Sequence, residues 1–173
     1  RAGSIVTAMT RNGRDFGIRV SGLGARWFIA PVNMPVGLFF SGYSQEDANP
    51  DIGDSAITEC LGIGGAAMIA APGVTRFVGA GGYSEALEIS EEMREIYVDT
   101  NPLFQIPTWD YQGACLGLDV RRVVETGITP VINTGIAHRM AGIGQVGAGT
   151  VRAPISCFEQ ALEALAVELG VQA

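Results

Sequence analysis

The sequence contains no lysine, so all eleven of its cationic side chains are arginines. Acidic residues number 18, and the formal net charge is −7 at pH 7. A surface that binds nucleic acid or an anionic membrane needs a basic face, so this balance excludes both as partners. The planar guanidinium fork suits bidentate capture of carboxylate or phosphate, although a genome that avoids lysine codons would give the same composition.

Cysteine and long apolar runs are also scarce. The three cysteines, Cys60, Cys115 and Cys157, form no CxxC pair, which argues against a disulfide framework and a structural zinc site and favours a cytoplasmic protein. The apolar run at residues 61–71 is shorter than the roughly 18 residues that span a bilayer, so we expect a soluble chain. Because the first residue is Arg1, we expect residues 1–173 to be one domain from the C-terminal portion of a longer protein.

Strand patterns dominate the N-terminal third. Two alternating runs flank Asn12-Gly13, a dipeptide that suits a tight hairpin turn because both residues tolerate positive φ. Short aromatic runs at residues 26–31 and 37–43 predict two more strands. We therefore expect a small, mostly antiparallel N-terminal sheet packed with several helices in mixed order, which is an α+β fold.

Four later segments are typical of helices. The apolar run 55–72 is stopped by Pro72, and an amphipathic pattern follows from residue 83, with Ser84 as N-cap and a stripe that extends to Tyr97. Residues 118–127 predict a short helix that ends at Gly127, and residues 154–170 predict another between a proline and a glycine. Between these last two, residues 128–133 predict a strand that ends at Asn133.

Two glycine-rich strings resemble phosphate-binding loops. GIGQVG, residues 142–147, fits GxGxxG, but it begins nine positions after the predicted strand end and no helix follows at the required place, so we reject a dinucleotide site. VGAGGYS, residues 78–84, lacks a flanking lysine and a Walker spacing. A flexible linker followed by a helix cap explains it better than an anion site.

The turn DANPDIGDS, residues 47–55, gathers oxygen ligands that could hold calcium or magnesium, or orient arginines. Its spacing does not fit an EF-hand, and the simpler interpretation is a turn in which Asp54 or Ser55 caps the next helix. The sequence leaves a metal undecided and indicates no cofactor. The residues that could contribute to a ligand site here are Asp47, Asn49, Asp51 and, one helical turn later, Glu59.

The only histidine, His138, follows the predicted strand end within one loop. Asn133 and Thr134 would present amide and hydroxyl groups at that end, and Arg139 would add a guanidinium. A lone histidine is more often structural than catalytic, but this combination favours a ligand site. We predict His138, Asn133 and Thr134 as catalytic residues that line one concave pocket, with the acidic turn in the same cleft.

Several long strings resemble those of the YlbE/YahG-like family across nearly the whole sequence: EDANPDIGDSAITE, DVRRVVETGITPVINTGIAHR, GQVGAG and CFEQALEAL. The resemblance implies a subunit of an oxamate carbamoyltransferase of allantoin breakdown, which converts oxalurate and phosphate to oxamate and carbamoyl phosphate. It also implies an FdrA-like partner and a third subunit. A homo-oligomer is compatible with it, and no catalytic residue can be carried over from the family.

Both implied substrates, oxalurate and phosphate, are small anions and need cationic forks. Arg139, Arg19 and Arg152 are the candidates from this sequence. A preorganised donor at the carbamoyl oxygen could contribute about 10²–10³ in rate, which His138 or the Asn133 and Thr134 pair would supply. The alternative is a non-catalytic structural or ligand-binding subunit that docks an FdrA-like partner through its glycine-rich loops. In either case we expect this fragment alone to be inactive.

Overall fold

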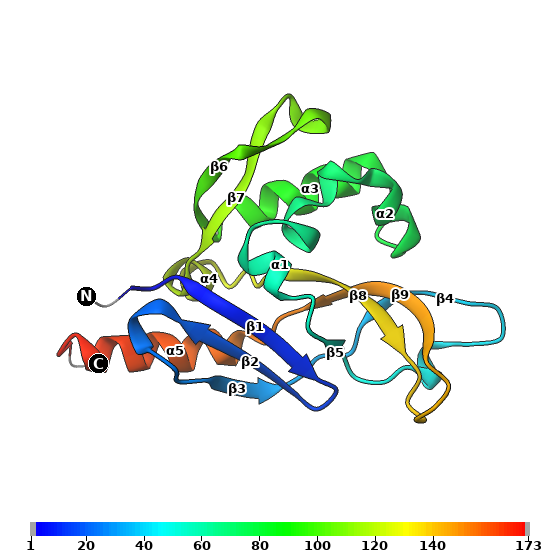
Figure 1. Ribbon diagram of the computed structural model, residues 1–173, viewed down its shortest axis with the longest axis horizontal. Coiled ribbons are helices and arrows are strands. Elements are labelled where there is room, and N and C mark those ends of the chain that lie inside the picture. Colours follow the sequence, from blue (N-terminus) through cyan, green and yellow to red (C-terminus); the bar gives the residue numbers. More distant parts are fainter. Residues whose placement is uncertain (1–2, 172–173) are drawn as a thin grey trace.

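A computed structural model describes residues 3–171, and Figure 1 shows their arrangement. An antiparallel sheet has the order β3-β2-β1-β5. Its strands are β1 (Val6–Asn12), β2 (Asp15–Val20), β3 (Phe28–Pro31) and β5 (Ile52–Gly53). The predicted hairpin forms, but its turn residues are Gly13, with φ +84°, and Arg14, because Asn12 still belongs to β1. The Asn12 side chain accepts hydrogen bonds from the N–H groups of Arg14 and Asp15.

A second antiparallel sheet has the order β4-β9-β8 and consists of β4 (Val36–Phe39), β9 (Gln145–Arg152) and β8 (Val131–Ala137). The chain therefore leaves the first sheet after β3, contributes β4 to the second and returns at β5. Strand β8 runs to Ala137, so the prediction that it ends at Asn133 was wrong. Its pairing with β9 sustains it, and the GxGxxG string forms the turn and the start of β9 instead of a nucleotide loop.

Helices α4 (Val120–Thr126) and α5 (Ile155–Glu168) pack on each other, and α5 also lies against β2 and β3. Gly127 ends α4 with φ +71°, as predicted. The main core lies between this helix pair and the first sheet, and its buried members include Phe16, Ile18 and Phe158. The α+β fold class is thereby confirmed.

The middle of the chain forms a separate layer: α1 (Ile57–Cys60), a 3₁₀ segment at Gly64–Ala70, α2 (Pro72–Phe77) and α3 (Tyr83–Arg94). The continuous helix predicted for residues 55–72 was wrong. Gly62 and Gly64 adopt positive φ there, and a Cβ on Gly62 would lie 1.7 Å from the carbonyl oxygen of Cys115. The chain bends because it passes directly against a neighbouring strand.

That neighbour belongs to a long hairpin of β6 (Tyr97–Ile106) and β7 (Gln112–Leu118), which projects from the body of the molecule (Figure 1). Sequence patterns did not reveal it, and they extended the preceding helix to Tyr97, which is the first residue of β6. The N-cap of α3 is Gly82, not Ser84, and Glu85 accepts a hydrogen bond from the Gly82 N–H. Within residues 3–171, no helix is both long and apolar enough to cross a bilayer.

Strands β4 and β9 approach unusually closely because glycines face one another across the pair. A Cβ on Gly149 would lie 2.3 Å from the carbonyl oxygen of Val36, so Gly149→Ala must push the strands apart. We expect a loss of about 1–3 kcal/mol in the free energy of unfolding, measured by urea denaturation. Gly73→Ala is the control: its site in α2 is exposed and open, and it should gain about 0.5–1 kcal/mol. Equal effects of the two substitutions would contradict the close approach.

Candidate functional site

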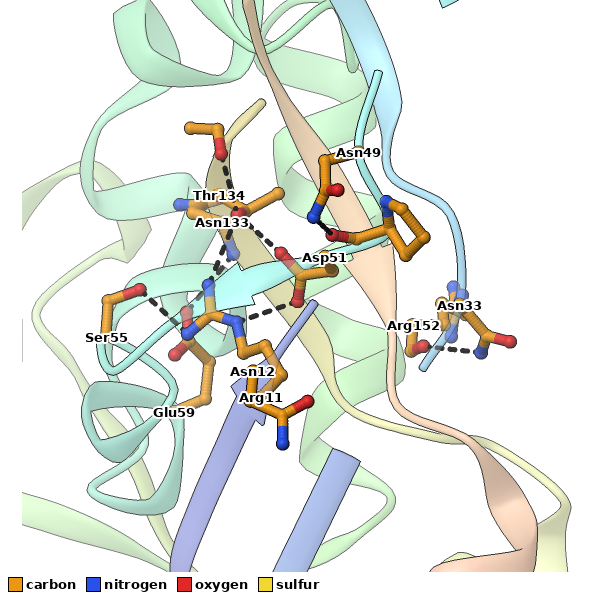
Figure 2. Close-up of polar contacts among 12 residues, drawn as sticks. Arg11, Asn12, Asn33, Asn49, Asp51, Ser55, Glu59, Asn133, Thr134 and Arg152 are labelled. Atoms are coloured by element: carbon orange, nitrogen blue, oxygen red, sulfur yellow. Dashed lines mark hydrogen bonds and ion pairs between the residues drawn. The ribbon is translucent and has the colours of Figure 1, made fainter. Parts of the chain in front are cut away.

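A fully buried ion pair joins the two sheets (Figure 2). The Arg11 Nε atom of β1 lies 2.7 Å from Asp51 Oδ2, and both side chains are 1% exposed. The guanidinium also donates to Ser55 Oγ at 3.1 Å and to Thr134 Oγ1 at 3.2 Å. The Thr134 hydroxyl in turn donates to Asp51 Oδ1 at 2.7 Å. Four segments of the chain are thus tied together by one charged network.

Glu59 forms a second buried polar centre beside this network (Figure 2). Its Oε1 accepts hydrogen bonds from the Gly65 N–H at 2.8 Å and the Asn133 N–H at 3.3 Å. Its Oε2 is 2.9 Å from the Thr58 hydroxyl. Burial raises the pKa of the Glu59 carboxyl above its ordinary value near 4.5, and these hydrogen bonds offset only part of that rise. Glu59 therefore fixes the 3₁₀ segment against β8 at an electrostatic cost near neutral pH.

Asn133 extends from β8 into a cavity of about 530 Å³. Its Oδ1 atom is buried and has no hydrogen-bond partner within the described part of the chain. The rest of the lining comes from the 3₁₀ segment, α2 and the β6–β7 hairpin, and is mostly apolar: Ile63, Gly64, Ala67, Met68, Ala70, Ala71, Val74, Leu103, Phe104, Gln105, Ile106 and Ala114. A carboxamide oxygen without a partner, at the wall of a mostly apolar cavity, marks Asn133 as a candidate ligand-binding residue.

His138 lies beyond the end of β8, away from this cavity's lining. Its Nδ1 accepts a hydrogen bond from the Met140 N–H at 2.9 Å, which leaves the proton of a neutral ring on Nε2. That Nε2 lies 3.7 Å from Asp47 Oδ1, and the ring packs edge-on against Tyr43. The side chain is only 7% exposed, so its present packing limits access by a substrate.

The acidic turn, residues 47–55, contacts two separate parts of the molecule, the β8–β9 turn and the Arg11 network. Its first part runs beside the β8–β9 turn, where the Asp47 carbonyl accepts from the Arg139 N–H, and its later residue Asp51 holds Arg11. Asn49 uses its side-chain amide on the Pro50 carbonyl. The predicted cap by Asp54 or Ser55 was wrong, because α1 has no side-chain cap. Within residues 3–171, no three His, Cys, Asp or Glu side chains cluster so as to hold a metal ion.

The predicted catalytic side chains do not line one pocket. Adjacent strand residues point to opposite faces, so Thr134 enters the ion-pair network while Asn133 enters the cavity. His138 stands apart from both, near Asp47 and the exposed Arg139.

The three predicted arginines are equally dispersed. Arg19 on β2 donates to the Gly24 carbonyl and lies over the Trp27 ring. Arg152 Nη2 lies 2.6 Å from Glu92 Oε2. Arg152 is at the end of β9, whereas Arg139 is in the turn that precedes β9, so the two arginines lie at opposite ends of this strand pair. These cations do not converge on a common anion within the described residues.

Sequence reasoning did not identify Arg11 as a site residue, and it considered Ser55 only as a helix cap. A usable signal was present for Arg11, because it shares the inward-facing side of β1 with the buried Met9 two residues earlier. A cation on the buried face of a strand requires a buried carboxylate close by. Asp51 lies 40 residues after Arg11, so local sequence patterns could not identify it as the partner.

The cysteines do not offer a nucleophile at neutral pH. Burial raises the pKa of Cys60 to about 12 and that of Cys115 to about 11. Burial likewise raises the pKa of Cys157 to about 12. All three thiols are therefore protonated near neutral pH, and a thiolate mechanism is disfavoured.

Comparison with known proteins identifies relatives across nearly the whole chain. Residues 1–55 match the family described as oxamate carbamoyltransferase subunit AllG. Over 171 residues, or 99% of this chain, the sequence is 78% identical to "Oxamate carbamoyltransferase subunit AllG" of Escherichia coli K12. Over 168 residues it is 48% identical to "Uncharacterized protein YahG" of the same organism. These matches support the assignment of the chain to the YlbE/YahG-like family.

A solved member of this fold is a conserved protein of unknown function from Enterococcus faecalis V583. Its crystal structure matches 95% of this chain with a TM-score of 0.92 and 52% sequence identity. The chain spans only part of these YlbE/YahG-like relatives: 41% of AllG, 35% of YahG and 39% of the Enterococcus protein.

The buried ion pair should dominate the stability of this YlbE/YahG-like segment. Asp51→Asn leaves the Arg11 guanidinium buried without its counter-charge, and we expect a loss of about 3–5 kcal/mol in the free energy of unfolding. The exposed Arg14–Asp15 pair provides the control, and Asp15→Asn should change stability by less than about 0.5 kcal/mol. In a double-mutant cycle, Arg11→Met with Asp51→Leu should cost less than the two single changes summed. Additive costs would mean that the pair is not coupled.

The raised pKa of Glu59 predicts a specific pH dependence. The folded state binds the proton more tightly than the unfolded state, so stability should fall as pH rises from about 4.5 through the folded pKa and then level off. Glu59→Gln can keep the hydrogen bonds, because Nε2 can donate to Thr58 Oγ1 once the Thr58 proton turns from this side chain to the Ser55 carbonyl.

We therefore expect Glu59→Gln to be more stable than the native chain near neutral pH, with a difference that shrinks towards pH 4.5. Urea midpoints measured between pH 4 and 8 provide the test, with the exposed Glu163→Gln as control. Parallel curves for the native chain and Glu59→Gln would contradict the raised pKa.

Proposed function

We propose that this chain is part of an oxamate carbamoyltransferase subunit that acts on oxalurate and phosphate. The observation that carries this proposal is its 78% identity, over 99% of its length, to a protein named as that subunit. In the proposed reaction the carbamoyl carbon of oxalurate loses its bond to the nitrogen that becomes the oxamate amide, and it gains a bond to a phosphate oxygen. The phosphate proton passes to the departing nitrogen, so oxamate and carbamoyl phosphate result.

Stabilising the negative charge on the carbamoyl oxygen requires a preorganised donor. Asn133 is the candidate that lines the cavity, and His138 carries an Nε2 proton that Asp47 does not hold at hydrogen-bond distance. Thr134 donates a hydrogen bond to Asp51 and accepts one from Arg11, and these two bonds fix the position of β8. Because Asn133 and His138 lie apart, we propose them as alternative donors to the carbamoyl oxygen, with Thr134 as a positioning residue.

Two anionic substrates need more cationic groups than this chain brings together. Arg11 is neutralised by Asp51, while Arg19, Arg139 and Arg152 lie in separate places. We therefore assign most anion binding to other parts of the intact protein or to its partners, an FdrA-like protein and a third subunit. This assignment also explains why the segment alone should not turn over substrate.

A structural role is the competing proposal, in which glycine-rich loops dock the FdrA-like partner. The observation that favours it is the β8–β9 turn, where Met140 is 62% exposed and Ile143 is 45% exposed between glycines. Apolar side chains displayed on a turn suit a protein contact.

One reconstitution separates these proposals. The intact protein with its two partners should form carbamoyl phosphate from oxalurate and phosphate, while the 173-residue chain alone should form none. In the assembled enzyme, His138→Gln should lower turnover by about 10²-fold if the imidazole stabilises the transition state. Complex formation is measured alongside by gel filtration. Full turnover by His138→Gln would remove His138 from the catalytic group, and failed assembly would support the docking role instead.

A further inference from the structure

The cavity that Asn133 enters has a polar end at β8 and the 3₁₀ segment, and a mostly apolar remainder in which Gln105 is the one polar side chain of the described lining. The Asn133 carboxamide and the neighbouring Gly64 backbone lie at the polar end, and Glu59 binds the backbone on both sides of it. The hairpin residues Leu103 and Phe104 line the other part and are 86% and 45% exposed, so they form a rim open to the outside. A small ligand could therefore enter past the hairpin and reach Asn133.

The chemistry of this end selects for a neutral planar group with both donors and an acceptor. A carboxamide offers one acceptor oxygen and two N–H donors, so it can pair face to face with another primary amide through two hydrogen bonds. Asn133 Oδ1 is shielded from water and has no partner in the described chain, which is costly, so a rotation of the carboxamide that pairs this oxygen with a ligand N–H would be favoured. The apolar walls strengthen such bonds by excluding water.

An anionic group is disfavoured at the same place. The described lining contains no cationic side chain, and transfer of an unpaired charge into apolar surroundings is costly. Glu59 lies directly behind the wall, where a Cβ on Gly64 would come within 2.4 Å of its Oε1. A carboxylate or phosphate would face both penalties, and a neutral carbamoyl group would face neither.

We propose that this cavity is a carbamoyl-binding pocket, in which Asn133 pairs with the H₂N–C=O end of the substrate. The assignment rests on the proposed function for its link to oxalurate, whose terminal group is a neutral carbamoyl. The charged end of the substrate and the phosphate then point out past the rim, towards cations supplied from outside this chain. Asn133 determines specificity for the amide over the acid, and Glu59 positions it through the strand backbone.

The pocket can be tested by binding before any turnover is measured. Met68 lines the cavity, so methyl-¹³C-methionine NMR of the intact subunit reports its occupation, and Met140 on the distant turn serves as an internal reference. The probes are acetamide and acetate, which have the same shape and differ in charge. A ligand of four heavy atoms cannot bind tightly, so acetamide should shift the Met68 signal with half-saturation at roughly millimolar concentration.

Acetate should leave the Met68 signal unchanged at the same concentrations. Asn133→Leu keeps the side-chain size but removes the carboxamide, and it should weaken acetamide binding by about tenfold or more, the equivalent of one or two lost hydrogen bonds. Asn33→Leu makes the same change at an exposed position and should have no effect on binding. Unchanged signals from the other methionines show that each variant is folded.

In the reconstituted enzyme, Asn133→Leu should raise KM for oxalurate about tenfold and leave KM for phosphate unchanged. Equal shifts of Met68 by acetate and acetamide, or full acetamide binding by Asn133→Leu, would overturn the carbamoyl pocket. Oxalurate phosphorolysis without any acetamide effect at Met68 would reject the pocket while the proposed function stands. Selective acetamide binding in a protein that does not phosphorolyse oxalurate would reject the proposed function and leave the pocket in place.

Discussion

The buried pair of Arg11 and Asp51 is the constraint on which the rest of the structure depends. Two charges are removed from water, and they are tolerated because each guanidinium nitrogen and each carboxylate oxygen has a hydrogen-bond partner, in part from Ser55 and Thr134. The pair connects β1 of one sheet with β8 of the other through the segment that leads into β5. Thr134 faces this network, so the alternation of the strand turns Asn133 towards the cavity.

Glu59 shows where the fold accepts a local loss of stability. Its hydrogen bonds hold the Gly64–Ala70 segment and β8 at a fixed separation, which shapes the polar end of the cavity. A neutral glutamine could make the same contacts without the cost of burying a charge. Residues that break a stability rule in this way are concentrated at functional sites, which is consistent with a role for this end of the cavity.

Under the proposed function, the charge distribution favours a division of substrate binding between this chain and the rest of the enzyme. The cavity offers neutral recognition, whereas Arg19, Arg139 and Arg152 are separated and already engage neighbouring groups through a side chain or the backbone. Since this chain spans 41% of AllG, the remaining part of such a protein and its partners have ample surface for binding anions. The neutral and charged ends of one substrate would then be recognised by different segments.

The sequence by itself determined features that depend on a few adjacent residues: the hairpin at Asn12-Gly13, the end of α4 at Gly127, and the α+β class. Only the tertiary structure decided the broken helix at Gly62, where a strand more than fifty residues later passes too close for a side chain. The same holds for the site. Asn133 and Thr134 were identifiable as polar residues on a strand, but Arg11 reaches partners 40 and 123 residues away. Local patterns record backbone preference and periodicity, whereas burial and pairing depend on which distant segments the folded chain brings into contact.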